Sequence, residues 1–168
     1  ATNDKKKLNN IIWDEEHWRF PEFTYEDAVR LSQEVFALAM EEKAGVCYQV
    51  VVNGFTAVRC FLTGTDESNI VWLERKKNTV LKSHRSSLRC GMEAEAAGSL
   101  EPWQEDTEHY VIRGGGYPIW RQDGTFVGAL CISGLHHEED HRMAAEAVRR
   151  YAERRKEKGH EGSGIDRG

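Results

Sequence analysis

Residues 114–141 constrain the fold more than any other part of this 168-residue chain. Three consecutive glycines are followed by a strand-like run that ends at an Asp-Gly pair at 123–124, which is typical of a tight β-hairpin turn. A second strand-like run ends near Ser133, and a helix then begins among histidines and acids. The order predicts a hairpin and a helix that place amides, a hydroxyl and imidazoles at one end of a sheet, a common position for a binding site.

A second hairpin is predicted for residues 46–62. An Asn-Gly turn at 53–54 separates two arms that are rich in β-branched and aromatic residues. Apolar side chains occur on both faces of these arms, so the sheet needs cover on both sides. Apolar residues at helical spacing after Thr24, and again near residues 66, 86 and 137, predict the covering helices. This order of elements predicts an antiparallel sheet with helices on both faces, an α/β sandwich.

The middle of the chain forms one unit between two polar ends. Residues 1–10 are lysine-rich and residues 159–168 are glycine-rich, and we expect both to be disordered tails. No linker or repeat interrupts residues 11–158, which predicts a single domain. The aromatic segment 13–23 is too apolar to be left in water, so we expect it to pack on the domain or on a partner subunit.

Charge and cysteine usage narrow the class of protein. With 23 Lys and Arg against 28 Asp and Glu, the formal net charge is −5, which gives no reason to expect nucleic-acid binding. No apolar run approaches the length of a membrane span, so we expect no membrane insertion. The four cysteines make no Cys-x-x-Cys pair and predict free thiols in a cytoplasmic protein: Cys47, Cys60, Cys90 and Cys131.

The run His-Glu-Glu-Asp-His at 137–141 matches the HExxH pattern of zinc proteases. We reject a metalloprotease, because His137 falls on the first turn of the helix and no third ligand follows at the usual spacing. The acids between the two histidines are explained as anions that the helix dipole stabilises. Metal binding by His136, His137 and His141 without proteolysis stays as an alternative.

Two further features permit either a structural or a binding role. The glycines at 114–116 suit a turn or a close approach of backbones, and they equally suit a backbone wall against a flat ligand. The cations at 75–89 suit a solvated face, or an anion site in which Arg75 binds a carboxylate in bidentate fashion. The sequence contains no nucleophile elbow of the GxSxG type.

Three segments in the same order resemble the GlcG-like haem-degrading domain family: NIVWLERKKNTVLKSHRSSLRCGME at 69–93, GGGYPI at 114–119 and VGALCISGLHHEEDH at 127–141. The resemblance runs from about residue 13 to residue 151, and it points to a branch known only as an uncharacterised protein family (UPF). It implies a three-layer α/β/α sandwich with a central antiparallel sheet, similar to profilin-like sensor domains. It also implies assembly into a homo-oligomer, a dimer or higher. The family pattern leaves position 137 variable, and Asp140 and His141 become the pair expected to share a role.

The resemblance and the expected convergence of strand ends lead to one hypothesis, a cytoplasmic oligomeric ligand-binding domain. The expected pocket residues come from five places in the chain: Arg75, Lys76, Ser86, Gly114, Gly115, Gly116, Ser133 and His141. Haem is the ligand that the resemblance suggests, with His141 or His84 as axial donor, and another small anionic ligand is the alternative. The branch has no established reaction.

Two other functions stay open. A non-catalytic oligomeric adaptor could present the aromatic segment 13–23 to a chaperone or a protein-trafficking partner. An enzyme that acts on a small carboxylate or a tetrapyrrole could use His141 as general base and Asp140 to orient it. Neighbouring residues on a helix point about 100° apart, however, so a direct contact between these two side chains is not assured.

Overall fold

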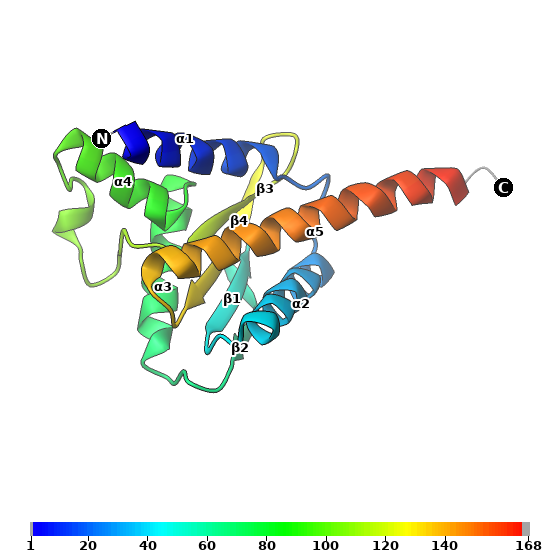
Figure 1. The fold of residues 1–168 in the computed structure, drawn as a ribbon, viewed down its shortest axis with the longest axis horizontal. Coiled ribbons are helices and arrows are strands. Elements are labelled where there is room, and N and C mark those ends of the chain that lie inside the picture. The colour runs from blue at the N-terminus through cyan, green and yellow to red at the C-terminus, as the bar shows by residue number, and fades with distance from the viewer. Residues whose placement is uncertain (1, 166–168) are drawn as a thin grey trace.

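The computed structural model describes residues 2–165 as a four-stranded antiparallel sheet with helices on both faces (Figure 1). The α/β/α sandwich predicted from the sequence is therefore confirmed. A short 3-10 helix, Trp103–Glu105, lies between the fourth helix and the third strand. The main elements, in chain order, are α1 (Thr2–His17), α2 (Tyr25–Glu42), β1 (Cys47–Val52), β2 (Phe55–Phe61), α3 (Asn69–Ser83), α4 (Ser87–Ala97), β3 (Gly116–Trp120), β4 (Phe126–Ser133) and α5 (His137–Ile165).

Both predicted hairpins form, and they join in the middle of the sheet. The strand order is β2-β1-β4-β3, with every neighbouring pair antiparallel. The backbone of Phe20 extends the β3 edge, because its N–H donates to the Trp120 carbonyl (3.0 Å) and its carbonyl accepts from the Gln122 N–H (2.7 Å). Strand β2 forms the opposite edge of the sheet.

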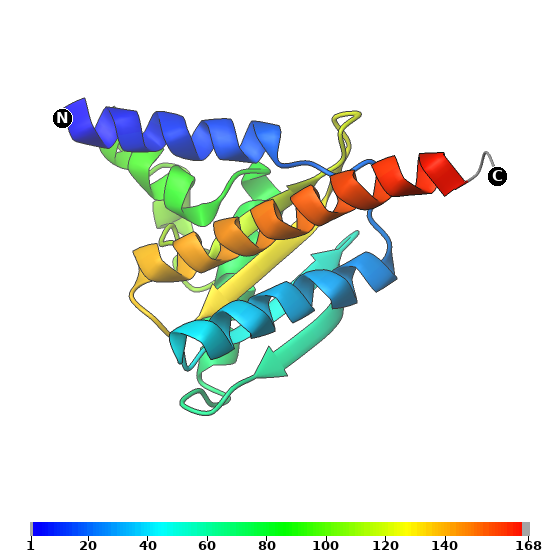
Figure 2. The same cartoon turned by 45° about the vertical axis from the view of Figure 1, so that its right-hand side comes forward.

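The two faces of the sheet bury different clusters, because successive side chains of a strand point to opposite sides. Tyr48, Val50 and Ile132 face α2 and α5, which lie side by side on one face (Figure 2). Cys131 and Leu73 belong to the smaller cluster under α3 on the other face. No helix in the described residues is long and apolar enough to cross a lipid bilayer.

The two ends of the chain differ from the predicted tails. Residues 2–10 are helical and form the first part of α1, and α5 continues to Ile165, while residues 166–168 lie outside the described part. The lysine-rich composition of residues 1–10 predicted a disordered tail. Residues 2–10 are helical instead, because α1 is anchored further along by tertiary contacts of the buried Ile11 and Glu15. Within the aromatic segment, Phe20 and Phe23 belong to the chain's own core and Trp13 is exposed.

Candidate functional site

A cavity of ≈ 390 Å³ lies between α1 and α5, and we call it the α1–α5 cavity. Its size falls within the usual range for small-molecule sites, about 300–1,000 Å³. Its apolar lining comes from Ile11, Trp18, Leu88 and Ala145. Its polar lining is charged apart from an amide and one imidazole: Lys7, Asn10, Asp14, Glu138, Glu139, His141, Arg142, Glu146 and Arg149.

His141 is the buried polar group of this cavity. Its side chain is on the first turns of α5 and is 7% exposed, and its Nδ1 has no hydrogen-bond partner. Its ring lies 5.7 Å from that of Tyr117 on β3, whose buried hydroxyl also lacks a partner. Burial lowers the pKa of His141 to about 4, so the imidazole is neutral at pH 7. Buried polar atoms are nearly always paired, so an Nδ1 that is itself buried and lacks a partner is unusual.

Asp140 turns away from His141 and joins α5 to α3. Its Oδ2 accepts from Lys76 Nζ (3.1 Å), which also donates to the Ile132 carbonyl (2.8 Å). Its Oδ1 accepts from the Leu135 N–H (3.0 Å), which caps the start of α5. Burial raises the pKa of Asp140, and Lys76 opposes that rise. In the described part no hydrogen bond joins Asp140 to His141, so this geometry does not give Asp140 the orienting role expected of it.

The three glycines pack closely against their neighbours. A Cβ at Gly114 would lie 2.2 Å from the His137 carbonyl oxygen. A Cβ at Gly115, whose φ is +133°, would lie 2.4 Å from the Ile132 carbonyl oxygen and 2.6 Å from Lys76 Nζ. Gly116 begins β3, and its N–H donates to Ser87 Oγ (2.9 Å). Of the two roles considered for this run, the structure matches the close approach of backbones.

The other predicted pocket residues lie apart from the α1–α5 cavity. Arg75 donates from Nε to the Glu108 carbonyl (2.8 Å), and its guanidinium lies over the Trp72 ring. Ser133 Oγ accepts from the Asn69 amide (3.2 Å). His84 stacks on Phe126 with ring centroids 3.9 Å apart. Among the residues predicted for the pocket, His141 is the one that lines this cavity.

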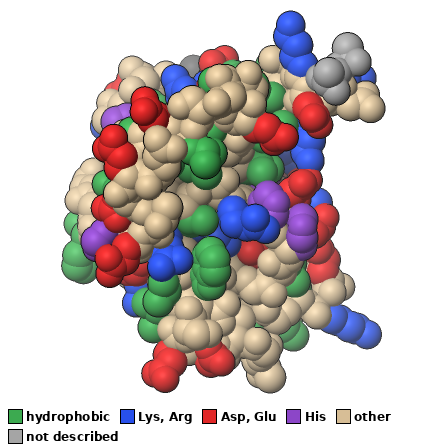
Figure 3. Space-filling model, turned by 90° about the vertical axis from the view of Figure 1, so that its left-hand side faces the viewer, with side chains coloured by type: hydrophobic (Ala, Val, Ile, Leu, Met, Phe, Trp, Pro, Cys, Tyr) green, Lys and Arg blue, Asp and Glu red, His purple; other side chains and the backbone are tan. Residues whose placement is uncertain are grey.

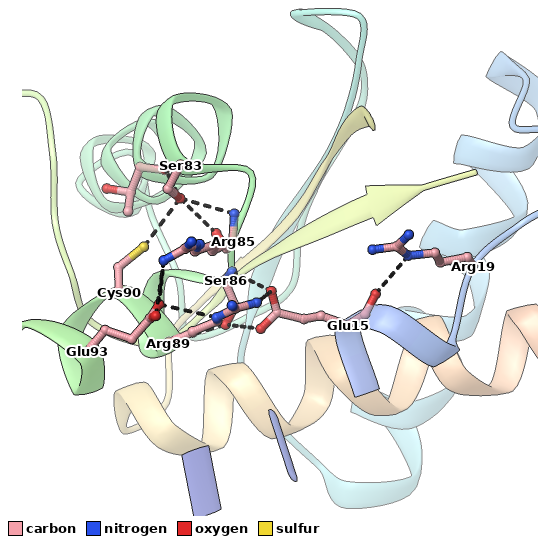
Figure 4. A network of polar contacts seen from close by, with 9 residues as sticks. Glu15, Arg19, Ser83, Arg85, Ser86, Arg89, Cys90 and Glu93 are labelled. Atoms are coloured by element: carbon pink, nitrogen blue, oxygen red, sulfur yellow. Dashed lines mark hydrogen bonds and ion pairs between the residues drawn. The ribbon is translucent and has the colours of Figure 1, made fainter. Parts of the chain in front are cut away.

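Glu15 is a buried carboxylate that no sequence motif singled out. It is 2% exposed, and it accepts from the Ser86 N–H (3.0 Å) and from Ser86 Oγ (2.9 Å) at the start of α4 (Figure 4). Arg89 approaches to 3.6 Å. Burial raises the pKa of Glu15 to about 7, although Ser86 and Arg89 act in the opposite direction. Ser86, predicted as a ligand contact, therefore caps α4 and holds α1.

The histidines at 136–141 do not converge on one point. His136 and His137 have ring centroids 4.8 Å apart, and His137 Nδ1 accepts from the Gly114 N–H (3.0 Å). Figure 3 shows histidine side chains beside basic and acidic ones on the face around the start of α5. Among the side chains that the structure describes, residues 3–158, no group of three or more His, Cys, Asp or Glu is arranged to hold a metal ion.

Comparisons with known proteins agree on one family. Residues 23–149 match the model described as haem degrading protein HbpS-like. A UPF0303 protein of Brucella melitensis biotype 1 is 30% identical over 148 residues, covering 87% of this chain and 88% of that protein. The crystal structure of the Ybr137w protein superposes with a TM-score of 0.77 at 29% identity over 88% of each chain. The PduOC:heme complex has the same fold, with a TM-score of 0.67 at 21% identity over 77% of this chain and 94% of that one.

Proposed function

This chain belongs to the HbpS-like family of haem degrading proteins, and from that premise we propose that it binds haem in the α1–α5 cavity. One observation carries the proposal: a buried, neutral imidazole with an unpartnered nitrogen lines the cavity. Neutral imidazole is the form of histidine that donates a lone pair to iron. A solved structure of the same fold is the PduOC:heme complex, which supports the choice of ligand.

The residues around His141 offer haem an apolar surface and three cations, in a lining that also carries four carboxylates. Ile11, Trp18, Leu88 and Ala145 offer apolar surface to a macrocycle. The three cations of the lining are potential partners for the propionate groups of haem. In this structure each already pairs with a carboxylate: Lys7 with Glu138, Arg142 with Glu42, and Arg149 with Glu146. A bound haem would supply one-electron chemistry, which no side chain of the cavity provides. The protein's own contribution is to hold the imidazole neutral and to keep it away from water.

Haemin titration followed at the Soret band tests this proposal. We expect a saturable shift in the wild type and in His84→Ala, since His84 lies outside the cavity. His141→Ala should lose the spectrum of the nitrogen-ligated iron, and added imidazole should restore it. Circular dichroism on each variant establishes that the fold is intact. An unsaturable shift in the wild type, or an unchanged spectrum in His141→Ala, would overturn the proposal.

A protein contact at α2 is a second proposal, which a separate observation supports. One face of α2 presents Tyr25, Val29, Phe36 and Met40, each 44–60% exposed, and we call it the α2 face. At about 100° per residue these four positions fall within a narrow arc. Phe55 on the edge strand β2 adjoins it, with its ring 6.1 Å from that of Tyr25. Exposed apolar side chains that gather on one face can mark a protein contact.

We propose that a second copy of the chain covers the α2 face in a homo-oligomer. An adaptor that binds a chaperone or trafficking partner through the same face is the alternative. The aromatic segment 13–23 is less suited to either role than expected, because Phe20 and Phe23 are committed to the core. The four cysteines are free thiols, which supports the further proposal of a cytoplasmic location.

A further inference from the structure

We propose that α1 is a lid over the α1–α5 cavity and that the buried contact of Glu15 with Ser86 holds it closed. This inference rests on the proposed function, since it concerns access to the cavity proposed to bind haem. Three features carry it: the cover that α1 provides, its sparse anchoring, and the placement of Glu15.

Helix α1 covers the cavity while burying little of itself. Lys7, Ile11 and Asp14 contribute to the cavity lining. Among the described side chains of this 16-residue helix, Ile11 and Glu15 alone are buried. A helix of this length is marginally stable by itself and depends on packing against the rest of the protein. Lys7 forms an ion pair with Glu138 on α5, but both side chains are exposed, so the pair adds little to the stability of the docked helix.

The chain after α1 is built to act as a pivot. Phe20 is fixed to β3 by two backbone hydrogen bonds, to the Trp120 carbonyl and from the Gln122 N–H. Between this anchor and the end of α1 lie Trp18 and Arg19, which belong to neither helix nor sheet. Figure 2 shows α1 along one side of the molecule, separate from the two helices that cover the sheet. Trp18 packs on the core and Arg19 lies over the Trp120 ring, so a rotation here that opens the cavity would break these two side-chain contacts and leave the strand pairing intact.

Glu15 is the contact that ties the middle of this lid to the body. Ser86 donates to both carboxylate oxygens, and in Figure 4 the side chain of Glu15 reaches from α1 to Ser86 and Arg89. From α4 it also faces Glu93 and Cys90, and from β3 it faces Tyr117. Burial raises the pKa of Cys90 to about 11 and that of Tyr117 well above its usual value, so neither titrates near neutral pH.

The sign of the pH effect follows from burial. The carboxyl of Glu15 has a pKa of about 7 when α1 is docked and an ordinary pKa of 4.5 in water. The docked lid binds the proton more tightly, so docking is most favourable below pH 4.5 and weakens as pH rises through 7. Between pH 6 and pH 8 the ratio of open to closed lid should rise about tenfold.

Hydrogen exchange measured by mass spectrometry on the haem-free full chain tests the lid. After correction for the intrinsic pH dependence of exchange, opening of residues 4–17 should rise about tenfold from pH 6 to pH 8 in the wild type. Glu15→Gln keeps the shape without the charge and should give pH-independent opening. Glu16→Gln, which removes the same charge from the exposed neighbouring position, should behave as the wild type.

A second variant keeps the test informative if Glu15→Gln is poorly folded. Arg89→Gln removes the nearest cation, at 3.6 Å, and should move the midpoint of opening to higher pH. Wild-type opening that is independent of pH, or a pH dependence that survives in Glu15→Gln, would overturn the lid. Because haem is absent from this experiment, its failure leaves haem binding untouched, and a failed haemin titration leaves the lid untouched.

Discussion

Burial favours the neutral forms of both Glu15 and His141, and their effects on stability have opposite signs. Burial raises the pKa of Glu15 from 4.5 to about 7, so its contribution is complete below pH 4.5 and is lost as pH rises through 7. Burial lowers the pKa of His141 from 6.5 to about 4, so its contribution is complete above pH 6.5 and is lost as pH falls through 4. Between pH 4.5 and 6.5 the two effects oppose each other in the wild type.

Single variants should separate these two contributions. Relative to the wild type, Glu15→Gln should gain about 3 kcal/mol in free energy of unfolding as pH rises from 4.5 to 7, because a charged carboxylate is no longer buried. His141→Gln should gain a similar amount, about 3 kcal/mol, as pH falls from 6.5 to 4. Urea denaturation at a series of pH values measures both. Difference curves that do not slope in opposite directions would contradict the buried placement of one residue.

Adding a single Cβ atom at Gly115 tests whether the glycine run at 114–116 is needed for close packing. Gly115→Ala would put a Cβ against the Ile132 carbonyl and Lys76, whereas Gly124→Ala also has positive φ (+89°) but meets nothing within 4 Å. We expect Gly115→Ala to cost clearly more stability than Gly124→Ala, by about 1–3 kcal/mol for overpacking. Thermal and urea unfolding compare the two. An equal loss would show that backbone strain alone requires glycine at position 115.

At the scale of elements, the ion pair of Lys76 and Asp140 joins α3 to α5 through the core. Both side chains are buried, at 4% and 2% exposure, so removing one leaves the other charge uncompensated. We expect Lys76→Met to lose about 3–5 kcal/mol, and Lys76→Met with Asp140→Asn to recover part of it. Lys77→Met, from a partly exposed pair with Glu74, is the control and should lose less than about 1 kcal/mol. Equal losses for Lys76→Met and Lys77→Met would contradict a buried pair.

Elements with local signals were predictable from the sequence, and elements held by distant contacts were not. The Asn-Gly and Asp-Gly turns fixed both hairpins, and the Thr24–Asp27 capping box marked the start of α2. Helix α1 was missed because Glu15 meets Ser86, a partner 71 residues away that no local pattern reveals. The pocket was only partly predictable for the same reason: His141 lines a cavity, but Lys76 and Ser86 are used by partners remote in sequence.

At the scale of the whole molecule, the α2 face predicts assembly. Phe36→Glu with Met40→Glu places charges on the exposed apolar face and should shift the oligomer toward monomer with little loss of monomer stability. Glu26→Lys with Glu41→Lys changes exposed charges on the same helix and should leave the oligomer intact. Sedimentation equilibrium measures both. An unchanged mass for the first variant would exclude the α2 face as the interface.

The central claim is that the α1–α5 cavity, with His141 as its buried donor, is where this protein binds haem. A crystal structure of the chain with haemin tests it most directly. We predict iron bound by the His141 imidazole and a macrocycle that packs against Ile11, Trp18 and Leu88. Haem bound at His84 or on the α2 face, with the α1–α5 cavity left free of ligand, would contradict it.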